Sequence, residues 1–456
     1  MDIKLGTVIL AAGKGTRMLS DNPKVMQSML GEPMLRYVLD ALSPLAAGNL
    51  WTVIGHGADM IRAFFGTEKT AFVVQEQQLG TGHAVQTAWA DVKKSGVSHI
   101  LVVNGDTPLI SMEAMRPFVE KSLAENADLS FITLTPDDAG AFGRVLRKNG
   151  TVSAIIEAKD YDEAVYGLCP NEINSGIYFL RVEAIGPLLP KLKNANKSGE
   201  FYITDLIELA VAENLTVSGI EMGNDMNLLG VNTPAELVVA EELLRARLVK
   251  KALDSGALVH APGLVRIGPD VVIEGGASIT GPCELYKKSR VAKGARVLSH
   301  CYFEDTEVLS GAVVHSFCHL VGAVVGENCV AGPFSRMRPG TVLEEGAHVG
   351  SFVEVKKSTI GKGAKANHLS YIGDAVIGAG TNIGAGVITC NYDGKNKHAT
   401  IVGENAFVGS NVSLVAPVTI EDNAFVGAGS TITKTVPGGH LGISRARQTN
   451  LPWNKK

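Results

Sequence analysis

Glycines and cations stand together near the amino terminus, in the run Leu10-Ala11-Ala12-Gly13-Lys14-Gly15-Thr16-Arg17-Met18. The run starts where a short aliphatic segment, 7–10, ends, and Pro23-Lys24 follows it. Glycine lets backbone N–H groups approach a phosphate chain, and Arg17 and Lys24 can neutralise the charge of a departing pyrophosphate. The run is neither a Walker motif nor G-x-G-x-x-G. It predicts a phosphate-binding turn, and the alternative is a glycine turn with solvated cations.

A second group of chemically capable residues lies in the carboxy-terminal half, at Arg338, Lys356, His368 and Tyr371. Two cations at adjacent positions of a repeating structure suit a sugar phosphate. A neutral imidazole can take a proton from an attacking amine, which is the step that amide formation from a thioester requires. For an isolated histidine, a satisfied structural role is the better prediction, and the spacing of its cationic neighbours favours chemistry at His368.

Short aliphatic runs separated by helix-length segments fill residues 1 to about 230 and must position the first group. This pattern is typical of a mostly parallel sheet flanked by helices, a Rossmann-like α/β domain, in which ligands bind beyond the carboxyl ends of the strands. The expected strands are 7–10, 51–54, 71–74, 100–103, 129–134 and 177–180.

A helix is expected at 233–253. Thr233 stands at its cap, Pro234 in its first turn, and Glu236 completes a capping box. This helix would join the two halves of the chain. The predicted domains are 1–230, a linker helix at 231–252, and a second domain at 253–456.

Aliphatic residues recur every six positions beyond the helix, most cleanly at Val402, Val408, Leu414, Ile420, Val426 and Ile432. A six-residue period indicates a parallel β-helix in which each hexad forms one face and three faces close a coil of about 18 residues. Arg338 and Lys356, one coil apart, should therefore stack on one face, whereas His368 should lie on another face or corner. The polar stretch 389–398 should project as a loop, with a tolerated surface insertion as the alternative.

Composition narrows the classes of function. The net charge is −4 and 45% of residues are hydrophobic. Basic residues cluster only around 14–17, which argues against nucleic-acid binding. The six cysteines form no C-x-x-C pair, so neither zinc nor a disulfide framework is indicated. The sequence shows no signal peptide and no 18-residue apolar stretch, which predicts a cytoplasmic protein without membrane attachment.

Several spaced motifs resemble one family. L-A-A-G-x-G-T-R-M with P-K resembles the signature of the sugar-1-phosphate nucleotidyltransferases. Further stretches make the chain similar, nearly end to end, to the bifunctional N-acetylglucosamine-1-phosphate uridylyltransferase/glucosamine-1-phosphate acetyltransferases. These stretches are Gln75 with Gln78-Leu79-Gly80-Thr81-Gly82-His83-Ala84, then Asn104-Gly105-Asp106, and Gly199-Glu200-Phe201-Tyr202-Ile203-Thr204-Asp205.

The resemblance implies a uridylyl-transfer site in the first domain. Asp106 would hold Mg²⁺ together with Asn232, which suits an ion that prefers oxygen ligands and keeps much of its water. Asn104 stands where the family usually has tyrosine, at a sugar or base contact. Nucleotide and phosphate contacts would come from Leu10, Ala11, Ala12, Gly13, Arg17, Lys24, Gln75, Gly80 and Thr81, and sugar contacts from Asn104, Gly143, Glu157, Asn174 and Asn232.

For the second domain the resemblance implies a left-handed β-helix, a homotrimer, and acetyl transfer from acetyl-CoA with His368 as the base. Cys390 lies beside this site, and its alkylation or oxidation could block acetyl transfer although no Cys-His-Asn order makes it a nucleophile. Glucosamine-1-phosphate would be bound by Arg338, Lys356, Tyr371, Asn382 and Lys397, and acetyl-CoA by Ala385, Asn391, Tyr392, Ser410, Ala428 and Arg445.

The sequence therefore predicts a bifunctional enzyme of UDP-N-acetylglucosamine synthesis that uses UTP and acetyl-CoA as co-substrates. One alternative is a single-activity nucleotidyltransferase, such as a glucose-1-phosphate adenylyltransferase, whose β-helix serves regulation. Another is a β-helix that only assembles trimers. His368 and the loop weigh against that last reading, because packing alone requires neither.

Overall fold

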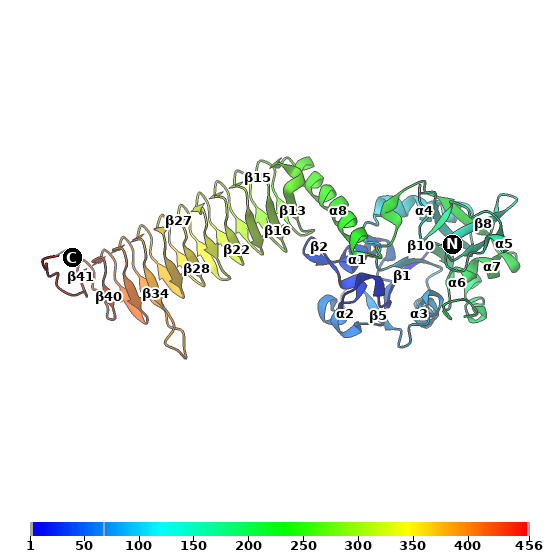
Figure 1. Ribbon diagram of the computed structural model, residues 1–456, viewed down its shortest axis with the longest axis horizontal. Coiled ribbons are helices and arrows are strands. Elements are labelled where there is room, and N and C mark those ends of the chain that lie inside the picture. Colours follow the sequence, from blue (N-terminus) through cyan, green and yellow to red (C-terminus); the bar gives the residue numbers. More distant parts are fainter. Residues whose placement is uncertain (1–2, 67–68, 454–456) are drawn as a thin grey trace. The chain divides into compact units, whose positions relative to one another are not determined.

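The computed structural model describes residues 3–66 and 69–453. The chain divides into two compact units, Met1–Leu243 and Leu244–Lys456, and helix α8 (Pro234–Asp254) runs through the division. Figure 1 shows an α/β unit and a stack of coils. No helix within the described ranges is long and apolar enough to cross a membrane.

The first unit is built on one mixed sheet in the order β11-β7-β10-β6-β1-β4-β5. Its neighbours are parallel except that β10 runs antiparallel to both β6 and β7. The expected strands all form and the sheet is mostly parallel, as predicted, with β10 as the antiparallel strand of this order. The strands are β1 (Leu5–Ala11), β4 (Leu50–Ile54), β5 (Ala71–Val74), β6 (His99–Asn104), β7 (Leu129–Leu134), β10 (Ile173–Arg181) and β11 (Val217–Glu221).

Both faces of this sheet are buried. Successive residues of β1 point to opposite sides, so that Val8 joins one apolar cluster and Ile9 the other. Trp89 of α3 packs in the first cluster and Phe118 of α4 in the second. The helices of the unit are α1 (Met34–Ala46), α2 (Ala58–Phe65), α3 (Thr81–Ser95), α4 (Met112–Ala124), α5 (Glu163–Tyr166), α6 (Val182–Ile185) and α7 (Asp205–Ala212).

Two short hairpins were not expected from the sequence. β2 (Ser28–Met29) pairs with β3 (Glu32–Pro33), and β8 (Arg144–Lys148) pairs with β9 (Thr151–Ile156). Short 3₁₀ turns η1 (Thr16–Met18) and η2 (Lys24–Met26) follow β1.

The start of α8 differs from the expected capping box in one bond. The Glu236 N–H donates to Thr233 Oγ1 at 3.2 Å, as predicted. The Glu236 carboxylate, however, accepts from the Asn232 N–H at 2.6 Å rather than from the N–H of Thr233. The cap therefore also fixes Asn232, one residue before the helix.

The second unit is a parallel β-helix whose strands form three faces, with parallel pairing between successive coils. Face 1 contains β12 (Leu258–His260), β15 (Ser278–Thr280), β18 (Arg296–Val297), β21 (Val313–Val314), β24 (Val330–Ala331), β27 (His348–Ser351), β30 (Lys365–His368), β33 (Asn382–Ile383), β36 (Phe407–Val408), β39 (Phe425–Val426) and β41 (Leu441–Gly442). Face 2 contains β13 (Val265–Ile267), β16 (Cys283–Tyr286), β19 (Cys301–Glu304), β22 (His319–Val321), β25 (Arg336–Met337), β28 (Glu354–Lys356), β31 (Tyr371–Gly373), β34 (Ile388–Cys390), β37 (Ser413–Val415) and β40 (Thr431–Ile432). Face 3 contains β14 (Val272–Ile273), β17 (Arg290–Val291), β20 (Glu307–Val308), β23 (Ala323–Val325), β26 (Thr341–Leu343), β29 (Thr359–Ile360), β32 (Ala375–Ile377), β35 (Thr400–Val402) and β38 (Val418–Ile420).

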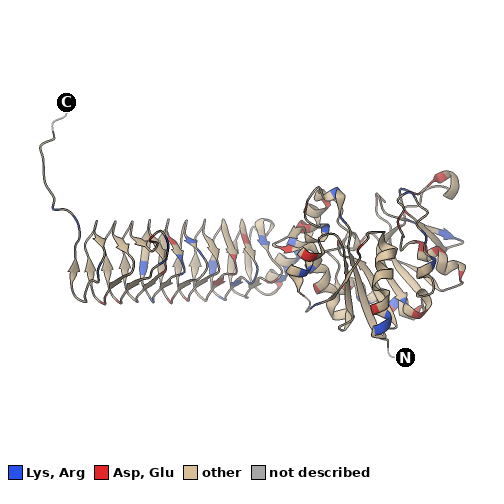
Figure 2. Ribbon diagram, turned by 90° about the horizontal axis from the view of Figure 1, so that it is seen from below, with Lys and Arg blue, Asp and Glu red and all other residues tan. Residues whose placement is uncertain are grey.

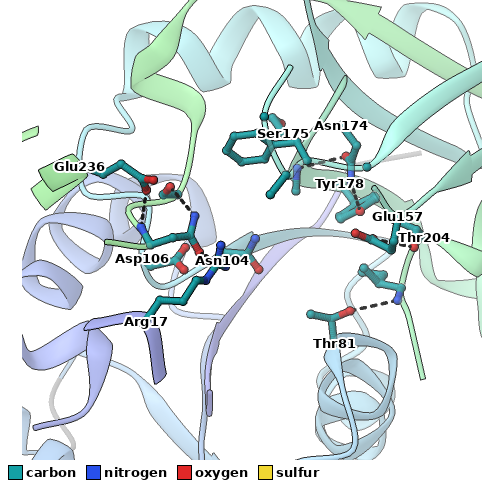
Figure 3. A pocket seen from close by; sticks show the side chains of 18 residues that line it. Arg17, Thr81, Asn104, Asp106, Glu157, Asn174, Ser175, Tyr178, Thr204 and Glu236 are labelled. Carbon is teal, nitrogen blue, oxygen red and sulfur yellow. Dashed lines mark hydrogen bonds between the residues drawn. The ribbon is translucent and has the colours of Figure 1, made fainter. Parts of the chain in front are cut away.

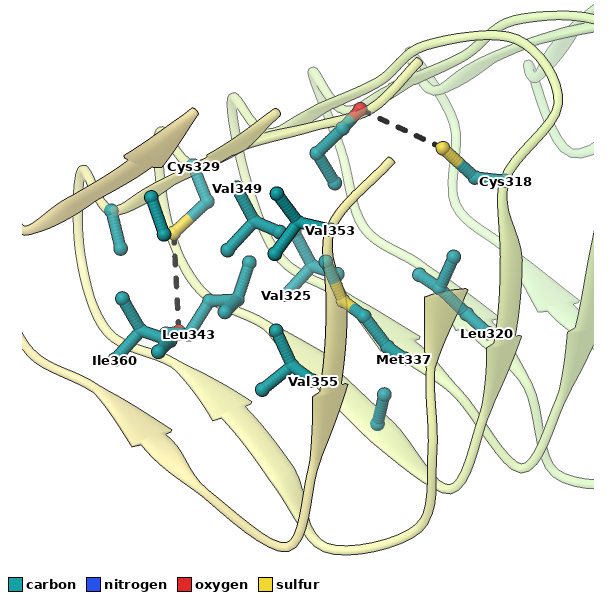
Figure 4. Packing of buried hydrophobic residues seen from close by; sticks show 14 of the residues in the cluster. Cys318, Leu320, Val325, Cys329, Met337, Leu343, Val349, Val353, Val355 and Ile360 are labelled. Atoms are coloured by element: carbon teal, nitrogen blue, oxygen red, sulfur yellow. Dashed lines mark hydrogen bonds between the residues drawn. The ribbon is translucent and has the colours of Figure 1, made fainter. Parts of the chain in front are cut away.

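Side chains that are mostly aliphatic fill the inside of the coils, and Figure 4 shows this packing. Leu320 of face 2 and Val325 of face 3 are 0% exposed. Figure 2 shows charged residues of both signs along the coils. The six cysteines are free thiols, and four of them are buried in these coils.

The corner between faces 1 and 2, here called corner 1–2, carries stacked aromatic rings. Phe317, Phe334 and Phe352 adopt positive φ and stack at centroid distances of 4.8 and 5.1 Å. Their side chains are 45–59% exposed. Corner 1–2 therefore presents an apolar ladder, defined here as Phe317, Phe334 and Phe352, to the outside of this chain.

The loop leaves the coils at the corner between faces 2 and 3, here called corner 2–3. Thr389 and Cys390 belong to β34 and Thr389 is buried, so the expected loop at 389–398 was placed two residues too early. The polar residues from Tyr392 onward project from the coil, as Figure 1 shows beyond β34. Because Thr389 faces the core and its hydroxyl donates to coil carbonyls, a polar residue was compatible with the strand.

Candidate functional site

The turn after β1 brings Arg17 and Lys24 to the carboxyl edge of the sheet. Gly15 has φ +63°, and a Cβ there would lie 2.4 Å from the Cβ of Lys24. Glycine therefore allows the close approach of the two segments. Arg17 Nη2 donates to Asn232 Oδ1 at 2.9 Å, and Lys24 Nζ donates to the same oxygen at 2.8 Å. Lys24 Nζ also forms an ion pair with Asp106.

Asp106 and Asn232, the two predicted metal ligands, are thus joined through one ammonium group. The Val231 N–H donates to the backbone oxygen of Asp106 at 2.8 Å, which holds the two segments together. Asp106 Oδ1 is buried without a hydrogen-bond partner among the described residues. A buried, unpaired carboxylate oxygen beside an amide oxygen fits a hard divalent cation. No group of three or more His, Cys, Asp or Glu side chains that could hold a metal ion is found in the described ranges.

A cavity of about 660 Å³ opens above this edge. Backbone and side chains of the glycine-rich turn form one side of it, and Gln75 and Gly80 form another. All the predicted nucleotide and phosphate residues line it, namely Leu10, Ala11, Ala12, Gly13, Arg17, Lys24, Gln75, Gly80 and Thr81. Lys14, Gln78 and Glu200, which were not predicted to make contacts, also line it.

Gly80 is required by the packing around the nucleotide cavity. It has φ +106°, and a Cβ at this position would lie 2.6 Å from the Phe201 carbonyl oxygen. The Phe201 N–H donates to the Leu79 carbonyl at 2.8 Å, and the Ile203 N–H donates to Thr81 Oγ1 at 3.1 Å. Two of the sequence motifs, 78–84 and 199–205, are therefore bonded to each other.

A second cavity of about 320 Å³ adjoins the first, and both are lined by Arg17, Thr81, Asn104, Asp106 and Asn232. The predicted sugar residues Gly143, Glu157 and Asn174 line this second cavity, as do Tyr178 and Thr204, which sequence reasoning missed. Figure 3 shows Asn174, Tyr178 and Glu157 facing Arg17 and Asp106 across the space.

A register shift in β10 sets the orientation of the Asn174 side chain. The register of β10 against β7 shifts between Asn174 and Tyr178. Asn174 Nδ2 donates to the Tyr178 hydroxyl at 2.6 Å, and Asn174 Oδ1 accepts from the Gly176 N–H at 3.1 Å. Gly176 has φ +85°, and a Cβ there would lie 2.5 Å from Asn104 Nδ2. Asn104, where the family usually has tyrosine, therefore packs against this bulge.

Glu157 presents a carboxyl group to the same cavity. Burial raises its pKa, while a hydrogen bond from the Thr204 hydroxyl, 3.2 Å away, opposes the rise. Asp205 lies in the same acidic region, and burial together with the charges of Glu208 and Glu157 raises its pKa to about 6. A buried carboxylate with few local donors is a strong acceptor for sugar hydroxyl groups.

In the second unit, the predicted cations lie together on face 2 and corner 2–3. The Arg338 N–H donates to the Val355 carbonyl at 2.9 Å, which places Arg338 beside Lys356 on the next coil, as predicted. Arg338 Nη1 also lies 3.1 Å from Glu354 Oε1. The neighbouring Lys397 and Arg338 lower the pKa of Lys356. Three cations with mutually unfavourable charges form a site that an anion would stabilise.

The loop that supplies Lys397 is internally ordered. Asp393 Oδ1 accepts from the N–H groups of Lys395 and Asn396, each at 2.7 Å, and Asp393 Oδ2 lies 2.7 Å from His398 Nε2. These contacts lower the pKa of Asp393, the backbone bond from Asn396 most strongly. Asn391 is buried and donates to Asp374 Oδ2 at 2.5 Å, and the exposed Tyr392 bonds to Gly394 O at 2.7 Å.

The remaining predicted residues lie elsewhere on the β-helix. His368 ends β30 on face 1, and Asn382 lies in β33 of the same face. Successive coils are bonded along corner 1–2, where Asn411 N donates to Ala385 O and Gly429 N to Ser410 O, both at 2.8 Å. Arg445 Nη1 donates to Ala428 O at 2.7 Å.

The residues predicted for acetyl transfer therefore form two groups in one chain. One group lies on face 1 and corner 1–2, and contains His368, Asn382, Ala385, Ser410, Ala428 and Arg445. The other lies on face 2 and corner 2–3, and contains Arg338, Lys356, Tyr371, Asn391, Tyr392 and Lys397. Face 2 separates His368 from the cationic corner, as the spacing of 12 residues from Lys356 predicted.

Comparison with known proteins accounts for both units. Residues 7–149 match the MobA-like NTP transferase domain, and residues 399–434 match six repeats of the bacterial transferase hexapeptide. A bifunctional protein GlmU of Nitratidesulfovibrio vulgaris is 60% identical over 99% of both chains. The GlmU proteins of Lawsonia intracellularis and Acinetobacter baumannii are 44% and 43% identical over at least 96% of each chain.

The chain belongs to the bifunctional GlmU family. Membership makes it a uridylyltransferase and a glucosamine-1-phosphate acetyltransferase in one chain. The hexapeptide repeats identify the coils of this GlmU family member as a left-handed parallel β-helix. Family membership therefore excludes the alternative hypothesis of a single-activity nucleotidyltransferase.

Proposed function

We propose that the protein makes UDP-N-acetylglucosamine in two steps at the two sites described above. The β-helix unit would transfer the acetyl group of acetyl-CoA to glucosamine-1-phosphate, and the α/β unit would couple the product to UMP from UTP with release of pyrophosphate. The observation that carries the uridylyl site is the pair of adjoining cavities that share Asp106, Asn232 and Arg17.

Asp106 and Asn232 would hold Mg²⁺, which supplies charge stabilisation at the phosphate oxygens when it is bound. The unpaired Asp106 Oδ1 supports this assignment. Lys24 neutralises the Asp106 carboxylate in the structure described here, and it lines the larger of the two cavities.

The chain's own residues would position the reactants for direct transfer. Glu157 and Asn174 would bind the sugar hydroxyl groups, so that the sugar phosphate oxygen faces the α-phosphorus of UTP. Arg17 and Lys24 would offset the charge that develops on the departing pyrophosphate. No protein nucleophile is required, and Gln75 and Gly80 would read the uracil.

The acetyl site would be shared between subunits of a homotrimer. Two observations support this proposal: His368 and the cations Arg338 and Lys356 lie at different corners of one chain, and the apolar ladder of corner 1–2 is exposed. Corner 1–2 of one subunit would contact face 2 of the next. His368 would then accept the proton of the attacking amine, and the cations would bind the phosphate. Monomers that retained full acetyl transfer on dilution would contradict the shared site.

The deciding experiment follows two signals in one reaction. The purified protein is incubated with Mg²⁺, glucosamine-1-phosphate, acetyl-CoA and UTP, while free thiol and pyrophosphate are measured separately. Both signals are expected, and His368→Ala should abolish thiol release while pyrophosphate still forms from supplied N-acetylglucosamine-1-phosphate. Pyrophosphate without any thiol from the unchanged protein would mean that the β-helix has no acetyl-transfer role.

A further inference from the structure

The side-chain amide of Gln75 is held from two directions at the edge of the nucleotide cavity. Gln75 follows β5 and is 3% exposed. Its Nε2 donates to the Gly80 carbonyl at 3.1 Å and lies 2.9 Å from Nδ1 of His83. The Gln75 backbone is fixed as well, because its carbonyl accepts from Gln78 Nε2 at 3.0 Å.

These two contacts settle which end of the amide faces which neighbour. A carbonyl oxygen only accepts, so the group that faces Gly80 must be the NH₂ of Gln75. The second hydrogen of that NH₂ then points to His83 Nδ1, which must offer a lone pair. In this arrangement Nδ1 of His83 acts as the acceptor. No donor among the described residues reaches Gln75 Oε1.

His83 is in turn held by its helix and by the 199–205 segment. It lies in the first turn of α3, next to Gly82, whose N–H donates to the Phe201 carbonyl at 2.8 Å. A Cβ on Gly82 would lie 2.8 Å from a methyl of Leu192, so the helix start is closely packed. The imidazole ring lies 6.4 Å from the Phe201 ring, centroid to centroid. The acceptor atom of His83 is thus presented at a defined place.

We infer that His83 is a positioning residue for base selection: it keeps the NH₂ of Gln75 turned inward and its Oε1 turned to the nucleotide base. The inference rests on the proposed function, in which Gln75 reads uracil. Uracil carries a hydrogen on N3 and offers a donor to Oε1, whereas cytosine has a lone pair on N3. Rotation of the Gln75 amide by 180° exchanges its donor and acceptor and would reverse that preference.

The expected discrimination is large because the groups are buried. A site built to pair with a substrate N–H rejects an analogue that lacks it by factors of roughly 10⁴ to 10⁵. Part of this discrimination depends on the free-energy cost of rotating the Gln75 amide into the flipped form. The flipped form would place Oε1 against the Gly80 carbonyl, two acceptors without a hydrogen between them, and it would require the proton of His83 to move to Nδ1. Removing His83 eliminates one of these two penalties.

The test compares His83→Leu with His83→Asn. Leucine removes the acceptor, whereas asparagine places Oδ1 near the position of Nδ1 and keeps it. Pyrophosphate release with N-acetylglucosamine-1-phosphate is measured with UTP and with CTP, to give kcat/KM for each. We expect the UTP-to-CTP ratio of kcat/KM to fall at least tenfold in His83→Leu and to be largely restored in His83→Asn.

A purely structural role gives a different result. Both kcat/KM values would then fall together in His83→Leu, the ratio would stay unchanged, and the inference would be overturned. Thiol release by the β-helix unit in the same samples reports the amount of protein present. If the unchanged protein released no pyrophosphate with UTP, the proposed function would fail instead, so the two failures are distinguishable. If His83→Leu does not fold, a reduced ratio in His83→Asn overturns the inference equally.

Discussion

Gly230 controls the position of the Asp106 carboxylate, and we predict that Gly230→Ala disables uridylyl transfer selectively. A Cβ on Gly230 would lie 2.6 Å from Asp106 Oδ1 and 3.1 Å from its Cγ. The backbone of Gly230 lacks the positive φ that would exclude alanine, so the added methyl group itself is the perturbation. The carboxylate must retreat by about 0.5–1 Å to restore an ordinary contact.

The size of the effect follows from that displacement. A misplacement of about 1 Å at a reacting group can cost roughly 10²-fold in rate. We therefore expect kcat/KM for pyrophosphate release to fall by about 10- to 100-fold, or about 1.4–2.7 kcal/mol of transition-state stabilisation. The Mg²⁺ concentration for half-maximal rate should rise, because Asp106 is the proposed ligand.

The assay measures pyrophosphate and thiol release from one preparation across a Mg²⁺ titration. Thiol release should be unchanged, since the residues proposed for acetyl transfer lie in the other compact unit. Gly263→Ala is the matched control, because a Cβ there meets nothing within 4 Å. Unchanged pyrophosphate release and Mg²⁺ dependence in Gly230→Ala would refute the role given to the carboxylate position.

Three further predictions address stability, pH and thiol chemistry. Leu320→Ala should lower the unfolding free energy by about 2–5 kcal/mol in urea titrations, because Leu320 is 0% exposed, whereas Leu258→Ala at a 57% exposed site should have little effect. Asp205 has a pKa of about 6 in the folded protein, above its unfolded value, so stability is lost as pH rises from about 4 to 6. Asp205→Asn should therefore flatten the pH dependence of the melting temperature over that range and stabilise the protein at pH 7 by about 1 kcal/mol, after discounting for partial exposure; an unchanged profile would contradict this. Alkylation of the partly exposed Cys390 should block thiol release from acetyl-CoA but spare a Cys390→Ser variant, and full labelling without inhibition would remove the hypothesis.

Much of the architecture could be predicted because it depends on periodicity. The hexads fix which side chain of each coil points inward, and alternation along β1 fixes which face of the sheet receives Val8 and Ile9. Strand direction is different. β10 is buried on both faces like its parallel neighbours, so its composition contains no signal for the antiparallel direction.

One missed element did carry a local signal. Asn149 and Gly150, both at positive φ, connect β8 and β9, and Asn-Gly between two strands favours a two-residue hairpin. The sequence therefore allowed this hairpin to be found. Sequence reasoning also took Glu236 as an ordinary capping residue, whereas its carboxylate bonds to Asn232.

The candidate site was predictable as a set of residues but not as a set of contacts. Lys24 meets Asp106 and Asn232 across 82 and 208 positions of the chain, and no local pattern specifies such a contact.

The stacked coils have a consequence for how a binding site of this kind can change. Neighbouring parallel strands stand about 4.8 Å apart, so side chains on one face occupy the points of a fixed grid. A substitution changes which side chain occupies a position on the face, as at Arg338 and Lys356, but it cannot move the backbone position itself. Lys397 stands off the grid, because the loop returns it to Lys356 from corner 2–3. An insertion at a corner leaves the aliphatic interior unchanged. Such an insertion can therefore place a side chain between the fixed positions of the coils and so adjust the fit to a new ligand.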